Sequence, residues 1–593
     1  MISAQAEPDS GSGSGPASGP ASGSATRPAS GPGSGPGPGP VAGARAGRAG
    51  EFRGFGTRWA LLISLLGGAA LFAAFPPVDA WPLAAAGPAL LVVALTGRSL
   101  RGSFGCGLAF GLAMFVPLIS WLVNVAWYGW FALAGAEAVI FAGLAVGQRL
   151  LLRLPFWPVG VAAWWVAVEA LRDRWPFAFP WGRLAMSQSV APDVRWVAVG
   201  GAPLLTFLVA LAGAMIARAG LHYLGEAHSR QAGLTPPVPP GSSQTSSPAS
   251  PRTSPAPPAS GRASRPRWPA LAPAIAAVAT VGLVLAGGLL PVDPAGGAPT
   301  AQVAAIQGDV PRARNLPQQL NDMQVTQHHA AATRKLAAQV KAARLAPPDL
   351  VIWPENSTDL DPFEYPGVYA TVAGAVAAVG RPILVGEVLD NPRRNVGQLW
   401  RPGRGPGPLY VKRQLVPFGE YIPFRGIISS FSSLPSLQPI DFTPGGKAVV
   451  FPVGAIRLGD VICYEAGFDN LVRSEVTAGA NLLTVQSNDA DFEIDGQLGE
   501  TEQQTAMARI RAIESDRAVV YVSTTGESTI IAPDGALIAH SGVWRQAILD
   551  ARVPLVSYRT LADRVGAWPE YVLVILTVLA LAWSVLRRPR RAG

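Results

Sequence analysis

Cys463 is one of two cysteines in this chain of 593 residues, and it follows a short apolar run in the stretch Arg457–Glu465. A thiol without a disulfide partner is either an inert buried side chain or a nucleophile. It becomes a nucleophile when a nearby base or positive charge favours the thiolate. The other cysteine, Cys106, lies among Gly and Phe residues in a long apolar stretch, and we interpret it as a packing residue.

A carboxylate and a lysine end two other predicted strands. Glu355 closes the segment Leu-Val-Ile-Trp-Pro-Glu, and Lys412 closes Leu-Tyr-Val-Lys. Lysine is scarce in this chain, since only Lys335, Lys341 and Lys447 accompany Lys412. A carboxylate can take a thiol proton, and an ammonium can stabilise a thiolate and later an oxyanion. Glu355, Lys412 and Cys463 at strand ends therefore favour nucleophilic catalysis over a structural thiol.

The strands that would carry these residues belong to a region of mixed character, residues 300–555. Short apolar runs alternate there with helical patterns, which predicts an α/β domain with helices packed on sheets. Strands are predicted at 302–307, 349–353, 383–388, 407–412, 456–462, 481–486, 518–523 and 527–532. Helices are predicted at 318–345, 367–379, 468–478 and 498–516.

The chain as a whole has the composition of a membrane protein. Hydrophobic residues make up 49% and charged residues only 14%, against roughly 25% charged residues in soluble domains. We expect a multi-span α-helical membrane domain of about eight transmembrane helices, because that many apolar stretches could cross a bilayer. Six lie within residues 58–228, the seventh at 269–291 and the eighth at 570–587; the six are near 58–75, 81–97, 104–123, 129–147, 155–171 and 195–217.

The basic residues predict the orientation of these spans. The net charge is +9, but the arginines cluster at the ends of apolar segments, so we expect no nucleic-acid partner. Arginines follow the second, fourth and sixth spans, whereas the loops after the first and third contain no Lys or Arg. By the positive-inside rule both termini are cytoplasmic and residues 300–555 are extracytoplasmic. Residues 1–57 and 229–268, rich in Gly, Ser, Pro and Ala, are expected to be a disordered cytoplasmic tail and linker.

The segments around the three candidate residues resemble the nitrilase (carbon–nitrogen hydrolase) superfamily. The flanking membrane spans narrow this resemblance to the apolipoprotein N-acyltransferases. The resemblance implies a nitrilase-like α-β-β-α sandwich with a Glu-Lys-Cys triad. The matching segments are Trp353–Glu355, Lys412–Tyr421, Cys463–Glu465, Ser487–Ala490, Ala508–Glu514 and, between the fifth and sixth spans, Phe179–Gly182.

The resemblance also implies roles for the matching residues. Glu355 would be the general base, Cys463 the nucleophile and Lys412 the stabiliser of thiolate and oxyanion. Glu420 would support the segment around Lys412. The remaining expectation concerns the substrate site, which Tyr464 and Glu465 would shape.

The implied reaction transfers an acyl chain from a membrane phospholipid, through a cysteine thioester, to the N-terminal amine of the diacylglyceryl-cysteine of an apolipoprotein. The enzyme would act as a monomer at the outer face of the bacterial cytoplasmic membrane, without a cofactor or metal. The chain departs from the family's pattern at Asp491, where tryptophan is usual, and at Gln504, where histidine is common. We expect these departures to bear on donor or acceptor preference.

Two other functions are consistent with parts of the sequence. A membrane-tethered amidase or nitrilase would hydrolyse a small amide with the same triad, but it would need one membrane anchor or none. A transporter or scaffold could use a nitrilase-like domain only for binding, yet a binding module has no need of all three triad residue types together. Both alternatives are therefore weaker than acyl transfer.

Some residues outside the triad carry narrower expectations. Ile427, Phe431 and Leu434 lie among serines in residues 425–442, and they could form a lid or dip into lipid. The alternative is a loop folded over the domain's own core. Glu137, within the fourth predicted span, would either bond to a neighbouring helix or lie near the lipid site. Glu169 and Arg172, three residues apart in the fifth span, would pair on one helix face, as residues at that spacing do.

Overall fold

A computed structural model describes most of the chain. Most of the predicted tail and linker lies outside the described residues, as do Phe431, Leu434 and Asp491. The described residues are 54–175, 177–233, 268–291, 297–310, 318–430, 438–490, 492 and 499–586.

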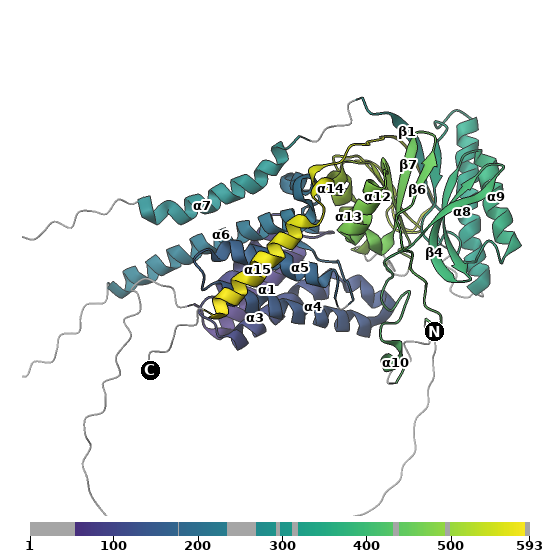
Figure 1. Cartoon of the computed structure of the whole chain (residues 1–593). Coiled ribbons are helices and arrows are strands. Elements are labelled where there is room, and N and C mark those ends of the chain that lie inside the picture. Colours follow the sequence, from purple (N-terminus) through teal and green to yellow (C-terminus); the bar gives the residue numbers. More distant parts are fainter. Residues whose placement is uncertain are drawn as a thin grey trace, which may run out of the picture. The chain divides into compact units, whose positions relative to one another are not determined.

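A helix occupies each position at which the sequence predicts a membrane span (Figure 1). These helices are α1 (Thr57–Ala73), α2 (Leu83–Leu95), α3 (Leu100–Leu118), α4 (Val123–Leu151), α5 (Trp157–Arg172), α6 (Val197–Gly233), α7 (Trp268–Leu285) and α15 (Trp568–Leu586). Within the described residues five helices, α3, α4, α6, α7 and α15, are long and apolar enough to cross a membrane. Since α1, α2 and α5 are shorter, the count of eight spans stays a prediction.

Glycines let the helices approach closely and bend. A Cβ at Gly107 of α3 would lie 2.5 Å from the carbonyl oxygen of Phe141 in α4, which is the close backbone approach typical of membrane helices. In α6 the backbone leaves helical geometry at Gly200 and Gly201, and Gly201 has φ +72°. A Cβ there would lie 3.0 Å from Oε1 of Glu514, so this bend meets the α/β part of the molecule. The bend therefore brings a membrane helix against the region that carries Cys463.

The α/β region contains two sheets of six strands each, in the orders β12-β1-β2-β3-β4-β5 and β11-β10-β9-β8-β7-β6. Three central strands of each sheet are parallel, β1–β2–β3 and β7–β8–β9, and the outer strands are antiparallel. The first sheet consists of β1 (Thr300–Gln307), β2 (Leu350–Ile352), β3 (Ile383–Asp390), β4 (Arg393–Arg401), β5 (Gly405–Val411) and β12 (Ala547–Pro554). The second consists of β6 (Val450–Val453), β7 (Ile456–Ile462), β8 (Leu482–Ser487), β9 (Val519–Ser523), β10 (Thr529–Ile531) and β11 (Leu537–His540).

Helices cover the outer faces of the two sheets, which gives the expected α-β-β-α layers (Figure 1). Buried apolar side chains of both sheets share one core, which includes Leu350 and Leu458. A second core lies between the first sheet and the helices α8 (Gln318–Lys341) and α9 (Pro366–Val379). The second sheet is covered by α12 (Asp469–Thr477) and α13 (Glu500–Ser515).

The core around α13 continues into the membrane helices. Buried residues of the second sheet and α13, such as Val485 and Met507, belong to the same apolar cluster as Phe115 of α3. Trp181, in the loop between α5 and α6, and Tyr464, next to Cys463, also belong to this cluster. The residue next to the candidate nucleophile therefore packs in an apolar core to which both parts of the chain contribute, while Cys463 itself belongs to the core between the two sheets.

Candidate active site

The structure brings Glu355, Lys412 and Cys463 together at the ends of three strands. Lys412 and Cys463 come directly after β5 and β7, and Glu355 lies just beyond β2. All three side chains are buried, and Cys463 interacts electrostatically with both partners. The carboxyl ends of strands from both sheets have thus placed a thiol, a carboxylate and an ammonium in one site.

Lys412 is the centre of the polar network. Its Nζ donates hydrogen bonds to Oε1 of Glu355 and to Oε1 of Glu420, each at 2.9 Å. Nδ2 of Asn395, on β4, donates to the same two oxygens at 2.6 and 2.9 Å. The second oxygen of Glu355 accepts from the backbone N–H of Asn488 at 3.0 Å. Glu355 is therefore held by three donors, and Glu420 joins the site as the second carboxylate on Lys412.

The backbone at Cys463 presents the sulfur from a tight turn. Cys463 has φ +52°, a left-handed conformation that is unusual for a residue with a Cβ, and it opens the 3₁₀ turn Cys463–Gly467. Backbone strain of this kind persists only where the surroundings fix the conformation, and it is found often at active sites. The side chain of Cys463 is 7% exposed.

The carboxylate of Glu465 fixes the Cys463 turn through four hydrogen bonds. Its Oε2 accepts from the Tyr410 hydroxyl at 2.7 Å and from the N–H of Ile462 at 2.8 Å. Its Oε1 accepts from the N–H groups of Arg413 and Gln414, at 2.7 and 3.0 Å. Since the carboxylate is wholly buried and receives four donors, Glu465 ties the Cys463 turn to the segment that follows Lys412.

Tyr464 points instead toward the membrane helices. Its hydroxyl donates to the carbonyl of Ala178 at 2.7 Å, and its ring stacks on Trp181 with centroids 5.5 Å apart. Trp181 in turn lies 5.9 Å from Trp121, between α3 and α4, and Trp121 lies 5.1 Å from Phe492. An aromatic row therefore runs from the membrane helices to the residue beside the candidate nucleophile.

Burial and neighbouring charges determine which of Glu355, Lys412 and Cys463 carries a proton in the free enzyme. Burial and then the Glu355 carboxylate raise the pKa of the Cys463 thiol well above its ordinary value, although Lys412 acts the other way. Burial also raises the pKa of Glu355, against the lowering effect of Lys412. Burial opposes the charge on Lys412, but Glu355 and Glu420 raise the pKa of Lys412 well above its ordinary value. The thiol therefore rests protonated, beside a carboxylate that can take its proton and an ammonium that stays charged.

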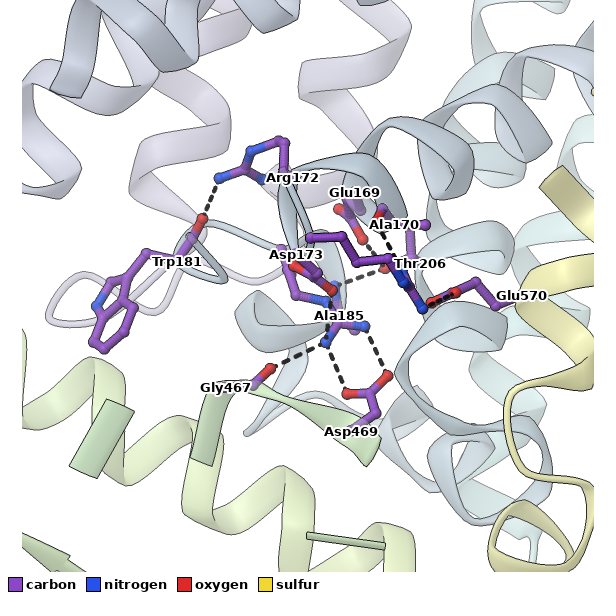
Figure 2. A network of polar contacts seen from close by, with 12 residues as sticks. Glu169, Ala170, Arg172, Asp173, Trp181, Ala185, Thr206, Gly467, Asp469 and Glu570 are labelled. Carbon is purple, nitrogen blue, oxygen red and sulfur yellow. Dashed lines mark hydrogen bonds and ion pairs between the residues drawn. The ribbon is translucent and has the colours of Figure 1, made fainter. Parts of the chain in front are cut away.

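A second polar network joins the α5–α6 loop to α12 (Figure 2). Nη1 and Nη2 of Arg183 donate to the two carboxylate oxygens of Asp469, at 2.7 and 2.9 Å. Arg183 also donates to the carbonyl of Gly467 at 3.2 Å, and Arg511 forms an ion pair with Asp469 at 2.7 Å. Because Gly467 ends the Cys463 turn, this network fixes the turn relative to the membrane helices.

The predicted pairing of Glu169 with Arg172 is wrong. Arg172 forms an ion pair with Glu137 of α4. It also donates to the carbonyl of Trp181 at 2.5 Å (Figure 2). Glu169 accepts instead from the N–H of Leu184 at 2.7 Å and from the Thr206 hydroxyl at 2.8 Å. Both residues are buried, so contacts between helices decide their partners, and Glu137 takes the first of its two expected roles, a bond to a neighbouring helix.

Of the three predicted lid residues only Ile427 is described. It lies on the short helix α10 (Arg425–Ile428), with its side chain 66% exposed beside Phe424, which is 68% exposed. Arg425 anchors this segment, since it pairs with Asp441 and donates to the carbonyl of Gln438. Both apolar side chains are exposed, and the role of this segment as a lid or a lipid contact stays a prediction.

Two residues of the site were not predicted to contact the triad. Asn395 bridges Glu355 and Glu420, but it belongs to β4, a polar strand whose sequence, Arg-Arg-Asn-Val-Gly-Gln, lacks the apolar pattern of its neighbours. Gln504 of α13 places Nε2 3.5 Å from the sulfur of Cys463. Its departure from the family's pattern marked the position, yet only the packing of α13 against the turn reveals the contact.

Comparison with known proteins agrees with this architecture. A family model described as carbon–nitrogen hydrolase matches residues 302–563, which contain both sheets and all three triad residues. The fold and the site therefore define a carbon–nitrogen hydrolase domain joined to a set of apolar helices. A solved structure of an amidase variant from Nesterenkonia, of the nitrilase superfamily, is distantly similar, with 17% identity and a TM-score of 0.33 over 45% of this chain and 94% of that chain.

The similarity to whole proteins is more specific. A second model, described as the apolipoprotein N-acyltransferase N-terminal domain, matches residues 67–215. The chain is 35% identical over 541 residues to the apolipoprotein N-acyltransferase of Mycolicibacterium smegmatis, covering 89% of this chain and 85% of the relative. It is 28% identical over 559 residues to the apolipoprotein N-acyltransferase of Azotobacter vinelandii, covering 89% and 95%. The chain belongs to the apolipoprotein N-acyltransferase family.

Proposed function

We propose that this chain transfers an acyl chain from a membrane phospholipid to the N-terminal amine of the diacylglyceryl-cysteine of apolipoproteins. Cys463 is the nucleophile, Glu355 the general base and Lys412 the group that stabilises negative charge. Glu420 and Asn395 hold Lys412 and Glu355 in place, and Glu465 holds the turn of Cys463. The names of its relatives and the composition of the buried site support this assignment.

In the first half-reaction the thiol attacks the ester carbonyl of the phospholipid. Glu355 takes the proton as the bond from sulfur to carbon forms, and Lys412 stabilises the developing oxyanion. The bond from carbon to the glycerol oxygen then breaks. Glu355 returns its proton to that oxygen, which leaves as the hydroxyl of a lysophospholipid and leaves a thioester on Cys463.

In the second half-reaction the amine of the apolipoprotein attacks the thioester. The bond from nitrogen to carbon forms, the bond from carbon to sulfur breaks, and Glu355 carries the amine proton to the departing sulfur. A thioester reacts readily with an amine, and a site that excludes water protects it from hydrolysis in the meantime. The burial of Cys463 supports this protection.

The single observation that carries the proposal is the stacking of Tyr464 on Trp181. The turn of the nucleophile is packed by the loop between two membrane helices, so the reaction centre is built at the end of the apolar helices. A soluble amide would need no such placement, whereas a phospholipid ester would. The pattern of arginines in the loops supports an extracytoplasmic site, and we propose that the enzyme acts as a monomer.

Mass spectrometry of a lipoprotein N-terminus tests the transfer directly. Cells with this gene should yield the triacylated peptide, and cells without it the diacylated peptide. Cys463→Ala should behave as the deletion does, and it should lower turnover in vitro by at least about a thousandfold because the attacking atom is lost.

Cys106→Ala is the matched control, since it removes the other thiol, which is buried among membrane helices. It should leave triacylation intact. The same diacylated peptide with and without the gene, or full activity in Cys463→Ala, would contradict the proposal.

A further inference from the structure

Gln504 lies on α13 with its side chain almost wholly buried and faces the sulfur of Cys463. Its Nε2 donates to Oε1 of Glu500, one turn earlier on the same helix, and lies 3.5 Å from Sγ of Cys463. Its Oε1 lies 3.2 Å from the hydroxyl of Ser487. An amide has two N–H donors on one side and only acceptors on the other, so Glu500 and Ser487 together set which end faces the sulfur.

The surroundings of the sulfur explain why a donor matters there. Three carboxylates disfavour a negative charge on sulfur, and one ammonium favours it; these groups are Glu355, Asp489, Glu500 and Lys412. The ammonium of Lys412 is already shared between Glu355 and Glu420. Among the residues that the structure describes, Nε2 of Gln504 is the hydrogen-bond donor within reach of Sγ. A hydrogen bond to the charged form of a group stabilises that form.

We propose that Gln504 is a further catalytic residue, whose Nε2–H stabilises the thiolate of Cys463 when Glu355 has taken its proton, with Glu500 and Ser487 fixing the direction of the amide. This role rests on Cys463 being the nucleophile of the proposed function. The amide gives up no proton and forms no covalent bond. Because an amide does not ionise near neutral pH, its donor is present at every pH at which the enzyme works.

The reactivity of the thiol tests this role without lipid or lipoprotein. We would measure the rate of alkylation of Cys463 by iodoacetamide in the full-length protein, from pH 5 to pH 9, with the modified peptide identified by mass spectrometry. Gln504→Leu keeps a similar size but removes the donor, and it should lower the rate about tenfold, the effect of a hydrogen bond to a charged group. Thr505→Val is the control, since the buried hydroxyl of Thr505 has no hydrogen-bond partner among the described residues, and it should leave the rate unchanged.

Gln504→His separates a hydrogen bond from mere packing. An imidazole restores a donor but ionises between about pH 5 and 8, so it should recover part of the rate and add an inflection absent from wild type and from Gln504→Leu. Below that inflection the imidazolium should speed alkylation relative to Gln504→Leu. A wild-type or higher rate in Gln504→Leu, or identical pH profiles for the histidine and leucine variants, would overturn the proposal. Normal alkylation of Cys463 in a protein that does not transfer acyl chains would instead count against the proposed function alone.

Discussion

Lys412 and Glu355 are both buried, and each would be costly to bury as a charged group without the other. An isolated buried charge is costly, and a pair repays that cost only when further hydrogen bonds satisfy its remaining atoms. Glu420 and Asn395 supply those bonds: the ammonium donates to the two carboxylates, and Nδ2 of Asn395 donates to the same two carboxylates. The site therefore keeps Lys412 charged while leaving Glu355 basic enough to act.

The resting state of Glu355 predicts the acid limb of the reaction. Glu355 must be ionised to take the thiol proton, and burial raises the pKa of its carboxyl group. The rate of thioester formation should therefore fall as the pH falls through a pKa above 4.5, the ordinary value for glutamate. Single-turnover measurements of lysophospholipid release between pH 4 and pH 8 would show this limb.

A buried carboxyl group away from the triad provides the comparison. Glu387 is held by the indole of Trp400, and burial raises the pKa of Glu387 to about 8. Glu387→Gln should leave the acid limb where it is. A limb that moves with Glu387, or one that lies below pH 4.5, would show that Glu355 is not the base.

Sequence alone predicted the triad because each member ends a strand and because lysine is rare in this chain. It did not predict the contacts of Asn395 and Gln504. Asn395 reaches Glu355 because the register between β4 and β5 places Asn395 beside Lys412. The backbone N–H of Lys412 donates to the carbonyl of Asn395 at 2.9 Å. Such contacts depend on register and helix packing, which a single sequence does not specify.

At the scale of elements, the α5–α6 loop and α12 act as one unit. Arg183 is 2% exposed and reaches both oxygens of Asp469, while Arg174, nearby on the same loop, pairs with Glu570 and is 52% exposed. Removing one partner of a buried pair leaves an uncompensated charge, whereas exposed pairs contribute little. Substituting each arginine in turn therefore compares a buried ion pair with an exposed one as a support for the turn of Cys463.

Arg183→Met should lower the free energy of unfolding by about 3 to 5 kcal/mol and reduce kcat, because the carbonyl of Gly467 and the carboxylate of Asp469 each lose one of their two arginine donors and Asp173 loses its ion pair with Arg183. Arg174→Met should cost about 1 kcal/mol or less and leave kcat unchanged. Thermal unfolding in detergent and acyl transfer would be measured on both variants. Equal effects would mean that the Arg183 network does not hold the turn.

The elements themselves were largely predictable. Every predicted strand in residues 300–555 has a counterpart. Six of the eight are the central parallel strands, whose burial on both faces gives continuous apolar runs. The strands β4, β6, β11 and β12 were missed. The sequence of β4 is polar, and β11 has exposed positions, so neither carries the pattern of a buried strand.

At the scale of the whole molecule, the orientation of the catalytic domain can be tested by labelling. In a background of Cys106→Ala and Cys463→Ala, Lys341→Cys places a thiol on an exposed position at the end of α8. Arg101→Cys places one in the exposed start of α3, after the second predicted span. A membrane-impermeant maleimide added to intact spheroplasts should label the first variant, and the second only after permeabilisation. The reverse pattern would put the catalytic domain in the cytoplasm.

The core shared by the two parts of the molecule also orders its assembly. Phe115 and Trp181 precede the catalytic domain in the chain, so the ribosome makes their side of this core before Tyr464 and Met507 exist. The helix α15 follows the catalytic domain in the chain, and it contacts the end of the α5 segment through Arg174–Glu570 and α4 through the hydroxyl of Ser584 on the carbonyl of Leu150. A catalytic domain made alone would therefore lack the side chains of the membrane helices and of the α5–α6 loop that pack against Tyr464.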